Sequence, residues 1–165
     1  MQKQDLERQF ERHINEHKAL LYKICRIYAY TDDDKQDLFQ EIVIQLWKAY
    51  PRFKGGSLFS TWLYRVAINT CISGLRKQKQ NIMVSAPVSE YEHIGDDSSS
   101  EAEDQLQQLY AAIEHLNDIE KAIVMLYMED HSYAEMEDIL GISQGTLRVK
   151  MNRIKEKLRQ LTKNY

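Results

Sequence analysis

Residues 132–165 read SYAEMEDILGISQGTLRVKMNRIKEKLRQLTKNY, and this stretch carries the signals of two helices joined by a tight turn. Ser132 and Glu135 have the S-x-x-E spacing of a capping box, which places the start of a helix directly after Ser132. Gly141 can take the left-handed conformation that ends a helix with the least strain. Ser143 can then cap a second helix. The stretch therefore predicts a helix-turn-helix.

The second helix of this pair is expected to bury one stripe and to expose cations around it. Apolar residues recur along it at spacings of four, three, four and three: Leu147, Met151, Ile154, Leu158 and Leu161. Six cations lie off this stripe: Arg148, Lys150, Arg153, Lys155, Lys157 and Arg159. Such a helix pair fits the major groove of DNA. The alternative is ordinary packing in an all-α protein, where a basic C-terminal helix also suits the helix dipole.

The distribution of charge supports nucleic-acid binding although the net charge is −3. Residues 51–89 hold six cations and no acid, and residues 142–165 hold seven cations and one acid. Between them, residues 90–138 hold fifteen acids and one cation. Two separated basic blocks predict contact with a polyanion at two places.

The order of helical and breaker signals divides the chain. We expect an all-α protein of two small helical domains joined by a flexible linker, with the helix-turn-helix in the C-terminal domain. The domains span 1–79 and 101–165, and the linker spans 80–100, where a proline, a glycine and a Ser/Asp run interrupt the helical period. The expected helices span about 4–29, 31–48, 58–79, 101–115 and 118–129, before the two of the helix-turn-helix.

Several classes of protein are disfavoured. The chain has no apolar run of membrane-spanning length and a polar N-terminus, which predicts neither a transmembrane helix nor a secretory signal. Its two cysteines, Cys25 and Cys71, are expected to be reduced thiols of a cytoplasmic protein. His13 and His17 have the i, i+4 spacing of metal ligands, but no third ligand is evident, so a solvated pair is the preferred interpretation.

The stretch FKGGSLFSTWLYRVAINTCISGLRKQKQ, residues 53–80, mixes cations with aromatic side chains. Phe53, Phe59, Trp62 and Tyr64 cannot all face one buried stripe of a helix. Aromatic rings beside cations suit single-stranded nucleic acid, because unstacked bases lie on rings while cations hold phosphates. The alternative is that these side chains form helix–helix contacts in the core.

Residues 32–78 resemble region 2 of the bacterial sigma-70 family, in the pattern of the small extracytoplasmic-function (ECF) sigma factors. The matching residues are Asp37-Leu38, Gln40-Glu41, Leu46-Trp47, Phe53, Phe59, Thr61-Trp62-Leu63-Tyr64-Arg65, Ala67 and Asn69. Residues 133–158 resemble region 4 of the same family. There the matches are Tyr133, Glu135, Leu140-Gly141-Ile142-Ser143, Gly145-Thr146, Arg148, Arg153 and Leu158.

The resemblance implies a subunit of bacterial RNA polymerase rather than an enzyme, with no catalytic residue, no metal and no cofactor. Its partners would be the β′ clamp helices and the β subunit of core RNA polymerase, promoter DNA in duplex and single-stranded form, and an anti-sigma factor, with no direct insertion into a membrane. The residues that would bind the polymerase are Asp37, Gln40, Glu41, Ile44, Gln45 and Trp47.

The resemblance also assigns two DNA sites. The melted strand of the −10 element would be held by Lys54, Phe59, Ser60, Trp62, Arg65, Asn69, Arg76 and Lys77. The −35 duplex would be read by Ser143, Gln144, Thr146, Arg148, Val149, Lys150, Asn152 and Arg153. Lys155 and Lys157 would add phosphate contacts that do not read sequence.

Three residues depart from the family pattern. Glu137 stands where a small alanine is usual, Ser73 where aspartate is frequent, and Val149 at a base-facing position often held by a polar residue. A competing hypothesis is a one-domain regulator of duplex DNA whose N-terminal helices dimerise or bind a ligand. The basic, aromatic stretch argues against it, because a regulator of duplex DNA does not need a site for single strands.

Overall fold

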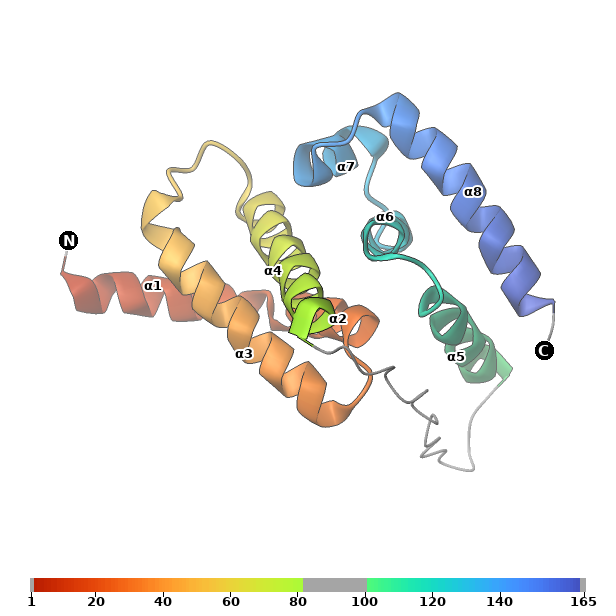
Figure 1. The fold of residues 1–165 in the computed structure, drawn as a ribbon. Coiled ribbons are helices and arrows are strands. Elements are labelled where there is room, and N and C mark those ends of the chain that lie inside the picture. The colour runs from red at the N-terminus through yellow and green to blue at the C-terminus, as the bar shows by residue number, and fades with distance from the viewer. Residues whose placement is uncertain (1, 82–100, 164–165) are drawn as a thin grey trace.

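The computed structural model describes residues 2–81 and 101–163, and every regular element within these ranges is helical (Figure 1). The first group contains α1 (Lys3–Glu16), α2 (Lys18–Tyr28), α3 (Asp32–Ala49), the short 3-10 helix η1 (Tyr50–Arg52) and α4 (Phe59–Asn81). The second contains α5 (Glu101–Ile113), α6 (Asp118–Met128), α7 (Tyr133–Leu140) and α8 (Gln144–Thr162). The all-α prediction is confirmed. The expected linker lies outside the described residues from residue 82 onward.

The expectation of one helix over residues 4–29 is wrong, because the chain breaks at His17 into α1 and α2. His17 leaves helical geometry at φ −109° and ψ 13°. Its imidazole Nδ1 lies 2.8 Å from the carbonyl oxygen of His13, one turn earlier. A polar side chain that engages a nearby carbonyl offers the backbone an alternative to the helical ladder. The N-terminal group therefore holds four α-helices rather than the three expected.

The other helix starts follow the capping signals of the sequence. Thr31 Oγ1 accepts a hydrogen bond from the backbone N–H of Asp34 at 3.1 Å, and α3 begins there. At the start of α6, Asn117 Oδ1 accepts from the N–H of Glu120 at 2.8 Å, while Glu120 Oε1 accepts from the N–H of Asn117 at 3.1 Å. This reciprocal pair is a complete capping box.

The N-terminal group buries its core between α2, α3 and α4. Leu21, Ile42 and Leu63, one from each helix, are fully buried. Cys25 and Cys71 are buried beside them as free thiols. Burial raises the pKa of Cys25 to about 11, so this thiol stays protonated and unreactive near neutral pH.

The C-terminal group packs α5, α6 and α7 against α8. The predicted stripe of α8 is confirmed, because Leu147, Met151 and Ile154 are buried, while Leu158 and Leu161 are half-buried. The cations of the helix are thereby left on its other sides.

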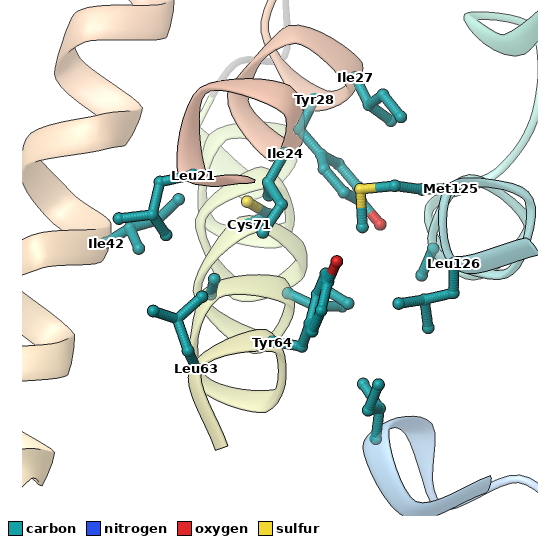
Figure 2. Close-up of a cluster of buried hydrophobic side chains, with 14 of the residues drawn as sticks. Leu21, Ile24, Ile27, Tyr28, Ile42, Leu63, Tyr64, Cys71, Met125 and Leu126 are labelled. Atoms are coloured by element: carbon teal, nitrogen blue, oxygen red, sulfur yellow. The ribbon is translucent and has the colours of Figure 1, made fainter. Parts of the chain in front are cut away.

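The two groups also pack against each other, with α2 and α4 facing α6 and α7 (Figure 1). Tyr28 of α2 and Met125 of α6 point toward one another, and Tyr64 of α4 lies beside Leu126 (Figure 2). Tyr28 also donates its hydroxyl to the carbonyl oxygen of Asp118 at 2.8 Å. The hydrophobic core is therefore continuous from one group to the other.

Candidate nucleic-acid and polymerase interfaces

The turn between α7 and α8 has the geometry predicted for a helix-turn-helix. Ser132 Oγ accepts from the N–H of Glu135 at 3.1 Å and caps α7. Gly141 follows α7 at φ 71°, the left-handed conformation that glycine adopts without strain. Ser143 Oγ then accepts from the N–H of Thr146 at 3.3 Å and caps α8. The first turn of α8 therefore begins directly after this tight turn, with Gly145 and Thr146 exposed.

Most of the residues predicted to read the −35 duplex lie on the open side of α8. Ser143, Thr146, Arg148, Val149, Asn152 and Arg153 are exposed, whereas Gln144 and Lys150 are half-buried. Val149 leaves 50% of its surface exposed, so its methyl groups are open to contact with a thymine methyl group. The guanidinium of Arg148 lies 5.1 Å from the ring centroid of Tyr133, and this cation–π contact holds it beside the turn.

Two other cations of α8 are engaged within the domain. Lys157 Nζ donates to both carboxylate oxygens of Glu120, at 3.0 Å and 2.7 Å. Lys155 Nζ lies 4.8 Å from the ring centroid of Tyr127. The sequence analysis expected both lysines to contact phosphates. In this structure their ammonium groups also bind side chains of α6 and so hold α8 against it.

The Glu120–Lys157 pair should make the protein less stable in acid. Burial alone would raise the pKa of Glu120, but hydrogen bonds from Lys157 and from the backbone of Asn117 outweigh it and hold that pKa below its usual 4.5. Stability from such a carboxylate is present above its unfolded-state pKa and is lost as the pH falls through the folded-state value. We expect the urea midpoint to drop between pH 7 and about pH 3.5, and to drop less in Glu120→Gln. Equal drops in both proteins would contradict this assignment.

The aromatic residues predicted to capture a melted strand form one cluster at the start of α4. The ring centroids of Phe53 and Trp62 are 5.2 Å apart, those of Phe59 and Trp62 5.4 Å, and those of Phe53 and Phe59 5.6 Å. All three side chains are half-buried, so each packs in the cluster and keeps part of its surface open. Tyr64 is buried at the contact with the second group.

The polar residues assigned to the same strand lie along α4 and the loop before it. Lys54, Arg65 and Asn69 are exposed and Ser60 is half-buried. Arg65 Nε donates to the carbonyl oxygen of Asp138 in α7 at 2.7 Å. Arg76 and Lys77 lie in α4, and their side chains are outside the described part of the structure.

His13 and His17 belong to the aromatic cluster at the start of α4. The sequence analysis did not predict this contact. The imidazole of His13 stacks on Phe59 with ring centroids 4.2 Å apart and planes at 20°, and His17 lies 5.1 Å from the same ring. Both histidines are half-buried rather than solvated. The described residues contain no group of three side chains able to hold a metal. The i, i+4 spacing of His13 and His17 was the sequence signal that could have indicated this contact, since it places both rings on one face of a helix.

The surface assigned to the polymerase lies on the outer side of α3. Asp37, Gln40, Glu41 and Ile44 are exposed, and Gln45 and Trp47 are half-buried. Ile44 leaves 47% of its surface exposed among these polar neighbours. Gln45 Nε2 donates to Glu41 Oε1 at 2.9 Å. Trp47 instead packs on Phe10 with ring centroids 5.0 Å apart, so it supports the helix as well as bordering this surface. No helix in the described ranges is long and apolar enough to span a bilayer.

Solved structures of similar fold cover nearly the whole chain. One is the sigma factor RpoE of Bartonella quintana in complex with the anti-sigma factor NepR, which matches with a TM-score of 0.73 at 20% identity over 94% of this chain and 97% of that one. Another is CnrH in complex with the cytosolic domain of CnrY, with a TM-score of 0.68 at 18% identity over 96% of this chain and 90% of that one.

Sequence comparisons identify the two halves separately. The family profile of sigma-70 region 2 matches residues 13–81, and that of sigma-70 region 4 matches residues 106–158. The ECF RNA polymerase sigma factor SigW of Bacillus subtilis is 28% identical over 87% of this chain and 83% of its own length. SigM of Mycobacterium tuberculosis, also an ECF RNA polymerase sigma factor, is 23% identical over 92% and 76%. The chain therefore belongs to the bacterial sigma-70 family of RNA polymerase sigma factors, within its ECF subgroup.

Proposed function

We propose that this protein binds core RNA polymerase in the cytoplasm and directs it to promoters, without catalysis of its own. The observation that carries this proposal is that one small chain has two different surfaces whose geometry suits nucleic acid. One is the exposed face of a helix-turn-helix, which suits a duplex. The other is a partly open aromatic cluster bordered by cations, which suits a single strand.

The start of α8 is proposed to enter the major groove of the −35 element. Arg148 and Arg153 are long enough to reach guanine edges or phosphates, and Asn152 can pair with adenine. The free N–H groups at the first turn, after Ser143, favour a phosphate at the same end. Sequence specificity would thus come from a few side chains. Contacts with the DNA phosphates would set the position of the helix in the groove.

The aromatic cluster of α4 is proposed to receive a base of the opened −10 strand. Only an unpaired base can lie on a ring, so binding at this site favours the open state over the duplex. Lys54 and Arg65 lie near enough in the sequence to hold the flanking phosphates, and Asn69 can reach a base edge.

The outer side of α3 is proposed to dock on the β′ clamp helices of the polymerase, with the C-terminal domain reaching the β subunit. An apolar centre such as Ile44, ringed by carboxylates and amides, has the composition of a docking surface with a polar rim. Because RpoE was solved with an anti-sigma factor and CnrH with the cytosolic domain of CnrY, we also propose an anti-sigma factor as a partner of this chain.

Copurification with bacterial core RNA polymerase, followed by transcription from a genomic library, tests the proposal. The expected result is a stable complex that starts transcription at a defined set of promoters. A protein that binds duplex DNA but never the core enzyme would instead be a one-domain regulator.

Trp62→Ala should weaken promoter opening by about 1–2 kcal/mol, because one ring of the stacking cluster is lost. Permanganate reactivity of unpaired thymines measures the opening directly. The variant must first give a normal thermal unfolding curve, since Trp62 also contacts Phe53 and Phe59. Binding to a −35 duplex serves as the control and should not change. Full opening by a folded variant would remove Trp62 from the strand site.

A further inference from the structure

The ring of Phe59 is surrounded by other rings of the aromatic cluster. His13 stacks on one face of it, with ring centroids 4.2 Å apart and planes at 20°. Phe53 meets the same ring edge-on at 5.6 Å, and Trp62 and His17 lie 5.4 Å and 5.1 Å from it in tilted orientations. A base that stacked on the face covered by His13 would have to displace that imidazole. Phe59 therefore supports other rings rather than forming the outermost layer on this side of the cluster.

His13 is the outer layer of this stack. Phe59 covers one face of its imidazole, and its other ring neighbour among the described residues, Tyr50, is tilted by 57° with centroids 6.2 Å apart. His13 is half-buried, so part of its side chain stays open. Histidine is among the side chains on which unpaired bases stack. The imidazole can therefore take a second flat partner on the side away from Phe59.

The backbone around His13 is held in place on both sides. Phe10 and Ile14 of the same helix are buried, which anchors the last turns of α1 in the core. The N–H of His17 donates to the carbonyl oxygens of His13 and Ile14, each at 3.2 Å, where α1 ends. A ring whose position is already fixed loses little conformational entropy when a ligand binds to it. The break between α1 and α2 thus places a preorganised ring beside the cluster.

The segment before α4 offers cations for the phosphates of a strand that stacks at this place. It follows Tyr50, the second ring neighbour of His13, and contains Arg52 and Lys54, both of which are exposed. Residues 51–89 hold no acid. Exposed cations beside a stacking ring are the combination that binds single-stranded nucleic acid.

We propose that His13 is a base-stacking residue of the strand site, so that an unpaired base lies on its imidazole with Phe59 behind it. The occupant is a single strand, because bases stacked within a duplex have no free face for a ring. The inference rests on the proposed function, which places the opened −10 strand at this cluster. It extends the strand site from the start of α4 to the last turn of α1.

Binding of two single-stranded probes to the full chain, measured by fluorescence anisotropy, tests this role of His13. One probe is an oligothymidylate of about twelve nucleotides, and the other is an abasic oligonucleotide of the same length, which has the phosphates but no bases. The wild-type chain should bind the first probe about fivefold more tightly, or better. His13→Ala should reduce this ratio by roughly threefold or more, with unchanged affinity for the abasic probe. His13→Phe keeps a flat ring and should retain the ratio.

His115→Ala is the matched control, because His115 is an exposed histidine of the C-terminal domain. This variant should bind both probes as the wild type does. Equal losses for both probes in His13→Ala would mean that His13 supports the fold rather than a base, and would overturn the inference. An unchanged ratio, or an equal loss of the ratio in His13→Phe, would also overturn it. Failure of the proposed strand site itself looks different, since the wild-type chain would then bind both probes equally.

A second measurement needs no substitution in the protein. Iodouracil placed in the oligothymidylate cross-links under ultraviolet light to aromatic and imidazole side chains that touch the base, and mass spectrometry identifies the modified residue. We expect an adduct on His13. Adducts found only on other residues, such as Phe59 or Trp62, would show that the base lies elsewhere in the cluster and would overturn the inference.

Discussion

Leu147→Ala is expected to lower the free energy of unfolding by about 2–5 kcal/mol, the usual cost of a buried leucine side chain replaced by alanine. Leu147 is fully buried where α8 packs against α7, so the lost methyl groups leave a cavity at the helix-turn-helix itself. The same cavity should loosen the angle between the two helices. Binding to the −35 duplex should therefore fall together with stability.

Urea unfolding followed by far-UV circular dichroism measures the first effect, and DNA binding at a temperature where the variant is folded measures the second. Val149→Ala is the matched control, because it removes an apolar side chain two residues later that is half exposed. Its unfolding free energy should change by less than about 0.5 kcal/mol. Comparable losses of unfolding free energy in the two variants would mean that α8 does not bury the face that carries Leu147.

Arg148→Ala is expected to weaken binding to the −35 element by about 1–3 kcal/mol, if the guanidinium makes a bidentate contact with a guanine. Arg148 is exposed at the start of α8, and its stacking on Tyr133 limits the orientations it can adopt. The loss should be concentrated at one base pair, since a base contact is specific whereas a phosphate contact is not. Fluorescence anisotropy with a set of single-substitution −35 duplexes measures both effects.

Arg159→Ala is the control for charge. Arg159 is exposed on the same helix, eleven residues and about 16 Å further along its axis, beyond the proposed groove contact. Arg148→Ala should relax the preference for one base, whereas Arg159→Ala should leave that preference unchanged. Unchanged base preference in Arg148→Ala, with weaker binding to every duplex, would reassign this residue to a phosphate.

Much of the helical organisation could be predicted because its signals are local. The caps at Thr31, Asn117, Ser132 and Ser143 are each formed by side chains within three residues of the groups they satisfy. The left-handed Gly141 is equally local. The break at His17 was missed because it lacks a glycine or proline and depends on a histidine side chain reaching a backbone carbonyl.

The candidate sites could be predicted to different degrees, because some depend on local signals and others on contacts between distant residues. The exposed face of α8 follows from the period of its buried stripe, which a sequence displays directly. The stacking of His13 on Phe59 joins residues far apart in the chain and has no local signal. The contact between the domains is of the same kind, since Tyr28 and Asp118 are ninety residues apart. Only tertiary packing brings such groups together.

The partner of Arg65 is a main-chain oxygen, and every amino acid at position 138 supplies one. Replacing Asp138 by alanine would therefore leave that hydrogen bond in place. An alanine scan of α7 would overlook the acceptor, and comparison of related sequences would not reveal it through substitutions at that position. A change of side chain at position 138 therefore does not release the guanidinium, whereas a shift of α7 as a unit or a new rotamer of Arg65 does.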